Sequence, residues 1–375
     1  MVFVSIGLRF RVEAEAMNMV EPLGAYTRHR IVYALRRVRR KQDDRVVLGY
    51  RAVPVPAISG QSVANAYSRA LVDLAKLTWG DKAPLCEECR DYLKYGGFTK
   101  RFDKATIGHD DRVRDCIIED ITGFLVATET EGGAEGGVAE GEKKRKRKRE
   151  ESEKEEKGEA ERIPRRTSAI WFSYMVPDID YGAEAIESQF HVQYNFVTQQ
   201  HRPFTIESGS AIYMQLVALD VDQIGRLKNG NYISDRLERV ELAFKALLAL
   251  YEGHVYGAKK SRYLPLSEIL GGVAAVSSTL PFMVSKPKLY YGDKTYIEDT
   301  IDRARKFVGV LASSSRLKDG VKLYVTYFDR EGVLKTKLEE RAEHLEIEGS
   351  ESFADMISKV LNKVLGYLQR GASRR

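Results

Sequence analysis

Three cysteines and one histidine carry the chemistry of a metal site. Cys86 and Cys89 form a Cys-x-x-Cys pair, and His109 and Cys116 follow downstream. Thiolates and imidazoles are the ligands that bind Zn²⁺ in a tetrahedral arrangement. Because the downstream pair lacks compact ligand spacing, we favour free thiols and expect no cofactor. Zinc binding, or a disulfide within the Cys-x-x-Cys pair, stays open as an alternative.

Basic and polar residues form five short clusters that suit a polyanion. Arginine pairs with phosphate through two parallel hydrogen bonds, and hydroxyls, amides and histidine rings add hydrogen bonds or stacking. Free N–H groups at a helix start also attract phosphate. The residues are Asn18 with Thr27, Arg28, His29 and Arg30; Ser59, Gly60 and Gln61; Arg165 and Arg166; His191; and Lys259, Lys260, Ser261 and Arg262.

Each cluster also has a simpler structural interpretation. The arginine and lysine clusters are equally typical of solvated loops or a linker end, and Ser59 is a good helix cap. A lone strand histidine such as His191 is more often structural than functional. Residue types alone therefore do not decide between nucleic-acid contacts and ordinary structure.

The motifs of several enzyme classes are incomplete or absent. The stretch GAKKSRYLP (257–265) lacks the glycine spacing of a nucleotide-binding phosphate loop. His109-Asp110 resembles a metal phosphohydrolase dipeptide but has no convincing further ligands. No HExxH, GxSxG or paired-carboxylate motif occurs, and six scattered histidines offer no nucleophile–base set. We therefore expect no catalytic residues.

Charge and composition describe a protein with a folded core and one unusual insertion. The 375 residues are 43% hydrophobic and carry a net charge of +6, which favours polyanionic partners. Residues 129–162 have no aromatic side chain and contain blocks of like charge, among them the basic run Lys143 to Arg149. This composition predicts a disordered insertion.

Nothing in the sequence indicates a membrane or an export signal. No apolar run is long enough to cross a bilayer, and the first residues lack the basic start and cleavage site of a signal peptide. Three cysteines do not form a disulfide framework, which is typical of a reducing compartment. We expect a cytoplasmic protein.

The hydrophobic periodicity predicts strands and helices in a recognisable order. A strand over 2–16 precedes a helix over 59–79, two adjacent strands over 187–197 and 208–220, a helix over 234–251 and a strand over 271–282. CIIEDITGFLVA (116–127) is predicted to be a strand or a buried apolar segment. The order is that of the ferredoxin-like plan shared by RNA-recognition folds. We expect an α+β protein with one RRM-like domain over 1–375, long insertions, and a C-terminal elaboration over 283–375.

Several stretches, taken in their order, resemble one protein family. They are VSIGLRFRVEAEAMNMVEPLGAYTRHR, YRAVPVPAISGQSVANAYSRALVDLAK, DCIIEDITGFLVA, PRRTSAIWFSYMVP, ESQFHVQYNF and GAKKSRYLP. They span most of residues 3 to 280 and are similar to the DevR-type backbone subunit of the archaeal subtype I-A CRISPR surveillance complex (Cascade). The insertion over 129–162 has no counterpart in this resemblance.

The resemblance implies a function that the residues alone do not. It implies a hand-like shape built on the ferredoxin-like core, and a non-catalytic subunit that forms a helical filament along guide RNA (crRNA). Target DNA would pair with that RNA, and other CRISPR subunits would complete the complex. The five clusters would contact the RNA backbone, although Arg165 and Arg166 lie directly beside the insertion. The alternative is an RRM-fold ribonuclease that processes guide RNA or cleaves target RNA, with Asp110, Asp111 or Asp293 as candidates that no motif marks.

Overall fold

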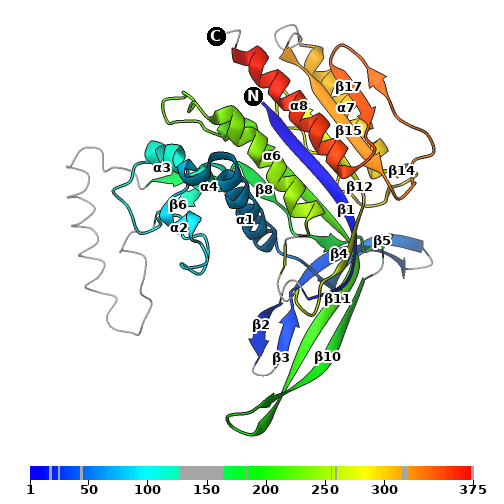
Figure 1. Ribbon diagram of the computed structural model, residues 1–375. Helices are drawn as coiled ribbons and strands as arrows, with labels where there is room; N and C mark the ends of the chain where they lie inside the picture. Colours follow the sequence, from blue (N-terminus) through cyan, green and yellow to red (C-terminus); the bar gives the residue numbers. More distant parts are fainter. Residues whose placement is uncertain are drawn as a thin grey trace, which may run out of the picture.

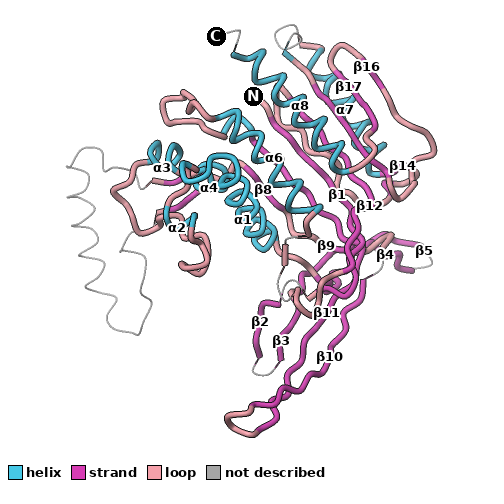
Figure 2. Tube along the Cα trace, in the orientation of Figure 1, coloured by secondary structure: helices cyan, strands magenta, loops and turns pink. Residues whose placement is uncertain are grey.

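The structure is a computed structural model that describes most of the chain. The residues described are 1–16, 19–23, 26–42, 45–126, 164–182, 184–254, 256–257, 260–314 and 320–372. The insertion predicted over 129–162 lies outside them. The described part is a mixed α/β structure with one large mixed sheet (Figures 1 and 2).

The large sheet has eleven strands, eight of which form a continuous path. The order along this path is β16-β17-β15-β12-β1-β11-β3-β2, and β8, β9 and β10 also pair with β11. Most pairs are antiparallel, whereas β11 with β3 and β15 with β17 are parallel. The strands are β1 (Phe3–Glu15), β2 (Met19–Leu23), β3 (Tyr26–His29), β8 (Ile170–Phe172), β9 (Val176–Pro177), β10 (Glu184–Asn195), β11 (Gln200–Asp220), β12 (Leu266–Ser277), β15 (Leu323–Asp329), β16 (Glu340–Arg341) and β17 (Leu345–Gly349).

The described structure also contains three two-stranded sheets, seven α-helices and two short 3-10 helices, Gly80–Lys82 and Val221–Gln223. The small sheets pair β4 (Ile31–Gln42) with β5 (Arg45–Pro56), β6 (Phe124–Leu125) with β7 (Arg165–Arg166), and β13 (Tyr290–Tyr291) with β14 (Lys294–Thr295). The helices are α1 (Gly60–Trp79), α2 (Glu87–Arg90), α3 (His109–Asp115), α4 (Ile117–Thr122), α6 (Arg236–Glu252), α7 (Tyr296–Ala312) and α8 (Phe353–Ala372).

Hydrophobic alternation in the central strands places helices on both faces of the sheet. Helices α1, α6 and α8 cover one face of the sheet (Figure 1). In β1 the side chains of Val4, Ile6, Leu8 and Phe10 join the core formed with these helices. In β12, Ala274 and Val276 join that core, while Val273 and Ala275 pack against α7 on the opposite face. Each fully buried aliphatic or aromatic side chain of this kind contributes about 1.5–3 kcal/mol.

Helix α1 begins where the sequence predicts. The Ser59 hydroxyl accepts a hydrogen bond from Ser62 N at 3.2 Å, and Gly80 ends the helix with φ 57°. At Gly60 the chain passes so close to β8 that an added Cβ would lie 2.5 Å from the carbonyl oxygen of Phe172. Glycine is therefore required at this position, since any larger residue would push the helix start away from the sheet.

The predicted pair of adjacent strands is a long hairpin that projects from the sheet. Strand β10 pairs with the first half of β11, from Asn195 opposite Gln200 to Glu184 opposite Ala211. The second half of β11 instead pairs with β1, β8 and β9. The hairpin thus extends beyond the sheet (Figure 2). Several of its apolar residues, among them Phe190, Val192 and Phe196, are exposed.

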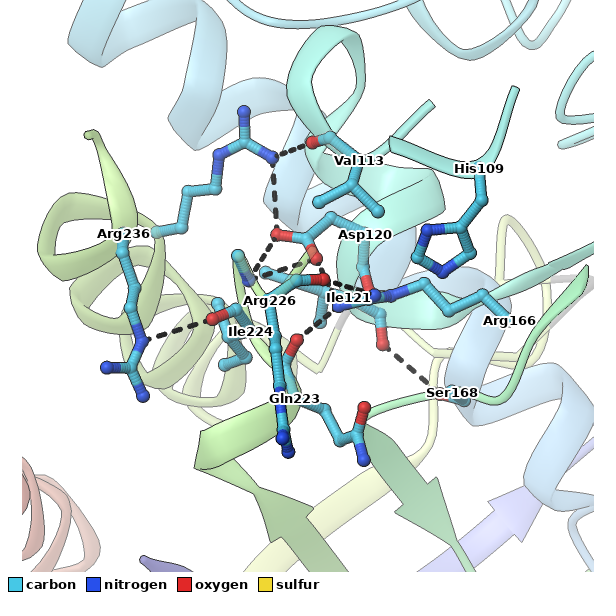
Figure 3. Close-up of polar contacts among 12 residues, drawn as sticks. His109, Val113, Asp120, Ile121, Arg166, Ser168, Gln223, Ile224, Arg226 and Arg236 are labelled. Carbon is cyan, nitrogen blue, oxygen red and sulfur yellow. Dashed lines mark hydrogen bonds and ion pairs between the residues drawn. The ribbon is translucent and has the colours of Figure 1, made fainter. Parts of the chain in front are cut away.

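A buried carboxylate joins three parts of the chain beside α1. Asp120 in α4 accepts hydrogen bonds from Arg166 at 2.6 Å, from Arg239 in α6 at 3.2 Å and from Gly225 N at 3.0 Å (Figure 3). Asp120 is 0% exposed, and both arginines are also buried. Because burying an ion is costly, this contact stabilises the fold only while all its partners are in place.

Replacing Asp120 with alanine should therefore be strongly destabilising. Asp120→Ala leaves the buried Arg166 without its carboxylate and Arg239 with Asp235 alone. We expect a loss of about 3–5 kcal/mol in the free energy of unfolding. Urea denaturation measures this loss. The matched control is Asp111→Ala, because Asp111 is 65% exposed and pairs loosely with Arg114 at 3.5 Å. An equal loss in both variants would contradict a structural role for the buried cluster.

Candidate nucleic-acid interface

Three polar side chains form a line along the exposed face of α1. Gln61, Asn65 and Arg69 are spaced four residues apart and therefore lie on one face of the helix. Arg69 donates to the side-chain oxygen of Asn65 at 2.9 and 2.7 Å, which holds the guanidinium over the preceding turn. A rigid helix thus presents amide groups and a positive charge in a fixed order.

An open groove of about 520 Å³ runs beside this face. Its lining includes Gln61 and Asn65 from α1, Tyr174 after β8, and Lys100 and Thr122 from the segment that contains α4. The lining is mixed, with aromatic rings next to hydroxyl, amide and carbonyl groups. Such a surface suits a chain of sugars and phosphates better than a purely apolar ligand.

Arg30 contacts one of the residues that line this groove. Its guanidinium donates to the Tyr174 hydroxyl at 3.4 Å. Its Nε is buried and has no hydrogen-bond partner among the described residues. Buried donors are normally paired, so the unpaired Nε of Arg30 is an exception among the described residues.

The basic loop before β12 approaches α1 from the other side. Lys260 donates to the carbonyl oxygen of His254 at 2.9 Å. Burial and the nearby positive charge of Arg69 together lower the pKa of Lys260. Like charges repel each other, so an anion that bound near both side chains would reduce the repulsion.

His191 connects the projecting hairpin to this loop. Its Nε2 lies 2.7 Å from the Tyr263 hydroxyl, which also donates to Gln189 at 3.0 Å. The imidazole stacks on Phe204 with ring centroids 5.3 Å apart. His191 thus brings the hairpin next to the loop that carries Lys260, and a direct contact of His191 with RNA stays a prediction.

We use the name α1 strip for the surface that these contacts connect. It consists of Arg30, Tyr174, Gln61, Asn65, Arg69, Lys260 and His191. The structure thereby connects parts of four of the five predicted clusters, namely the turn with Arg30, the helix start with Gln61, the hairpin histidine and the basic loop. The cluster of Arg165 and Arg166 is not among the connected contacts.

Three residues that were predicted to contact RNA are buried. His29 is 2% exposed and bonded to Glu15, and Arg166 is 9% exposed and bonded to Asp120. Ser59 is 4% exposed and caps α1. These side chains have structural partners in the interior, so we omit them from the interface proposed below, and their contact with RNA stays a prediction.

The other predicted residues occupy varied positions. Arg28, Arg165, Ser261 and Arg262 are exposed, Gly60 is buried under β8, and Thr27 lies in β3. Asn18 and Lys259 lie outside the described residues. Their contact with RNA stays a prediction.

A second basic surface, on the β4–β5 hairpin, was not predicted from the sequence. Tyr33 and Tyr50 are 76% and 70% exposed. The strand register places Arg37 opposite Tyr50 and on the same face as Tyr33. Aromatic rings beside arginines are typical of surfaces on which bases stack. The alternation in IVYALRRVRRKQ (31–42) is the signal that could have indicated it.

The cysteines come together without the predicted histidine. The Sγ atoms of Cys86, Cys89 and Cys116 all lie within 4.8 Å of one another. His109 is not in this group, because its ring contacts Asp110 at 2.8 Å and packs on Phe124. Among the described residues, these three thiols are the one group of Cys, His, Asp or Glu ligands close enough to share a metal ion.

The acidic candidates for catalysis have other contacts or stand apart from one another. Asp110 accepts a hydrogen bond from Lys228 N at 2.9 Å, and Asp111 pairs with Arg114. Asp293 lies in the turn between β13 and β14.

No helix within the described ranges is long and apolar enough to cross a membrane.

His29 and Glu15 form a buried ion pair whose strength depends on pH. Nδ1 of His29 faces the carbonyl oxygen of Arg30 at 2.9 Å, and Nε2 faces the Glu15 carboxylate. Because both nitrogens face acceptors, the ring is an imidazolium. Burial lowers the pKa of His29, but the hydrogen bond and charge of Glu15 raise it more, so the net pKa is above its ordinary value.

The stabilisation from His29 should disappear in alkaline solution. A raised pKa stabilises the folded state fully below the unfolded value of about 6.5, and the effect is lost as pH rises through the folded pKa. We expect the Tm of the wild type to fall more between pH 6 and pH 9 than that of His29→Gln, in which the side chain carries no charge at either pH. The exposed His201→Gln control should retain the wild-type pH dependence. A parallel decline in all three proteins would refute the ion pair.

Comparisons with known proteins identify the family. Residues 6–301 match the family described as CRISPR-associated negative auto-regulator DevR/Csa2. The chain is 30% identical over 329 residues to the CRISPR-associated aCascade subunit Cas7/Csa2 2 of Saccharolobus solfataricus, covering 82% of this chain and 88% of the relative. It is 26% identical over 287 residues to the CRISPR-associated protein Cas7/Csa2 1 of the same organism, covering 71% and 76%.

Solved structures described as a CRISPR RNA-guided surveillance complex, one of them in a pre-nicking state, also match. Each covers 96% of this chain and 99% of its own, with a TM-score of 0.44 and sequence identities of 12% and 13%. The match of the family over residues 6–301, together with the 30% identity over 82% of the chain, is decisive. This protein belongs to the DevR/Csa2 family.

Proposed function

We propose that this protein is a non-catalytic backbone subunit of a CRISPR surveillance complex that binds crRNA along its phosphate backbone. The observation that carries the proposal is the α1 strip, on which residues from four distant parts of the chain converge. Membership of the DevR/Csa2 family supports the same function.

The chemistry of the strip suits sequence-independent contact. Arg69 and Lys260 offer positive charge to phosphate, and Gln61 and Asn65 offer amides that can bond to a 2′-hydroxyl. The groups come from a rigid helix and a loop fixed by internal hydrogen bonds. A guide RNA must leave its base edges free to pair with target DNA, and contacts of this kind leave them free.

We also propose that the core of the fold is ferredoxin-like. Strands β12, β1, β11 and β8 are neighbours in that order and pair antiparallel. Along the chain, α1 connects β1 to β8, and α6 connects β11 to β12. This order and these crossings are what a βαββαβ unit requires, with β10 and the distal half of β11 as an insertion that forms a projecting part of a hand-like shape.

Self-association would use the projecting hairpin. Phe190, Val192 and Phe196 are 70%, 54% and 85% exposed, which is unusual for one strand of a water-facing hairpin. If this surface contacts a different surface of the next subunit, repeated contacts generate a helical filament. Such a filament would hold crRNA in the cytoplasm for pairing with target DNA, together with other CRISPR subunits.

Removing two cations of the strip should weaken RNA binding for every RNA sequence. For Arg69→Ala with Lys260→Ala we expect about tenfold weaker binding for each lost charged contact. The slope of log affinity against log salt should fall by about 1.4, or about 0.7 for each lost phosphate contact. Fluorescence anisotropy with two unrelated single-stranded RNAs measures both effects.

The control for this experiment is Lys306→Ala, because Lys306 is exposed on α7 at the opposite face of the sheet. It should bind RNA like the wild type. A loss confined to one of the two RNA sequences, or an equal loss in Lys306→Ala, would contradict backbone recognition by the strip.

Charges on the hairpin should limit assembly without preventing RNA binding. The variant with Phe190→Asp and Val192→Asp places carboxylates where the next subunit would pack. Sedimentation on an RNA long enough for several subunits should show shorter assemblies, while affinity for a short RNA is unchanged. Val310→Asp, at an exposed position of α7, is the control. If the hairpin variant loses affinity for the short RNA as well, the face that carries Phe190 and Val192 contacts RNA and not the neighbouring subunit.

A further inference from the structure

Three cysteines from two distant segments meet in the interior beside α1. Cys86 directly precedes α2, Cys89 lies within it, and Cys116 lies between α3 and α4. They are 8%, 0% and 0% exposed. The backbone holds the two segments together, since Ile117 N donates to the carbonyl oxygen of Pro84 at 2.9 Å.

The spacing of the three thiols fits a shared metal ion. Their Sγ atoms lie within 4.8 Å of one another. Sulfurs around one tetrahedral zinc ion are about 3.8 Å apart, given a Zn–S bond of about 2.3 Å. A small contraction of the group is therefore enough for all three to bind the same ion. A disulfide would join only two of these sulfurs, whereas a metal ion binds all three.

A buried carboxylate next to the thiols has an unused oxygen. Glu88 is 6% exposed and interacts with the Cys86 thiol. One of its oxygens pairs with Lys104, and Oε2 is buried with no hydrogen-bond partner among the described residues. An unpaired buried carboxylate oxygen is costly unless something binds it. Glu88 stands outside the group of donors that lie within 4.8 Å, so its side chain must rotate to reach a shared ion.

Positive charges around the cluster suit an anionic metal centre. Lys100 and Arg101 both interact electrostatically with the cysteines, and Lys104 pairs with Glu88. Three thiolates and a carboxylate around Zn²⁺ carry a net negative charge. These cations offset that charge in the interior, where an unbalanced ion would be unfavourable.

We propose that Cys86, Cys89 and Cys116 bind one structural zinc ion, with Glu88 as the fourth ligand. On binding, each thiol releases its proton to solvent and its sulfur donates an electron pair to the metal. The ion would join α2 to the segment between α3 and α4. The same part of the chain supplies Lys100 and Thr122 to the groove beside the α1 strip. This proposal does not depend on RNA binding.

The test uses the full chain, reduced and freed of metal by a chelator. Titration with zinc chloride against a chromophoric zinc indicator should show one equivalent bound, and Co²⁺ in its place should give a thiolate-to-cobalt charge-transfer band. Zinc should also raise the Tm of the stripped protein. Uptake well below one equivalent by the folded, reduced wild type overturns the proposal, as does a cobalt spectrum without thiolate bands.

The two glutamates between Cys86 and Cys89 give a matched pair of variants. Glu88→Gln should weaken zinc binding by tenfold or more, whereas Glu87→Gln should not change it, because Glu87 is 62% exposed and bonds to Tyr95. Equal affinities for Glu88→Gln and the wild type would rule out Glu88 as a ligand. Cys89→Ser should abolish binding, and if it fails to fold, the stoichiometry of the wild type still decides. Recovery of a Cys86–Cys89 disulfide from a protein that takes up no zinc after reduction also overturns the proposal.

Discussion

The buried charge of Asp120 is the constraint on which the helical side of this protein depends. Its carboxylate is fully enclosed and receives hydrogen bonds from Arg166, Arg239 and Gly225 N. These donors come from the chain that follows the insertion, from α6 and from the turn before α6. A carboxylate in the interior is tolerated only with such partners, so the position of α4 is fixed by all of them together. Since α4 ends at Thr122, the same contacts also fix one wall of the groove beside α1.

Strong periodicity made the long elements predictable, whereas short ones needed the tertiary structure. The strand at the N-terminus, the hairpin of β10 and β11, and helices α1 and α6 all occur where the sequence indicates them. The stretch 116–127 was ambiguous, because a short apolar run is equally compatible with a strand and a buried helix. It forms α4 and the two-residue β6. The hairpin was predicted, but the change of partner halfway along β11 depends on strands far away in the sequence.

The sequence shows which residue types could form the candidate site, but not which of these side chains are exposed to solvent. A sequence cannot distinguish an arginine facing water from one facing an internal carboxylate when that carboxylate is distant. Arg166 binds Asp120, which is 46 residues away, and His29 binds Glu15 in a different strand. Conversely, the sequence does not predict Arg69 as a site residue, because a single charge in a helix is common. Its spacing from Gln61 and Asn65 shows that one face of α1 is polar, and only the fold brings its charge near enough to contribute to the lowered pKa of Lys260.

In the function proposed above, the positive charges of Arg69 and Lys260 give a physical reason for building the site from dispersed residues. Two like charges held together destabilise each other, and burial adds to this by lowering the pKa of Lys260. The repulsion is relieved by any anion of suitable size, and in RNA the same anion recurs at every nucleotide. Affinity then comes from the phosphate and position from the amides of α1, while base edges contribute to neither. In the proposed function, dispersed cations on a helix and an anchored loop would therefore bind the RNA backbone without preference for base sequence.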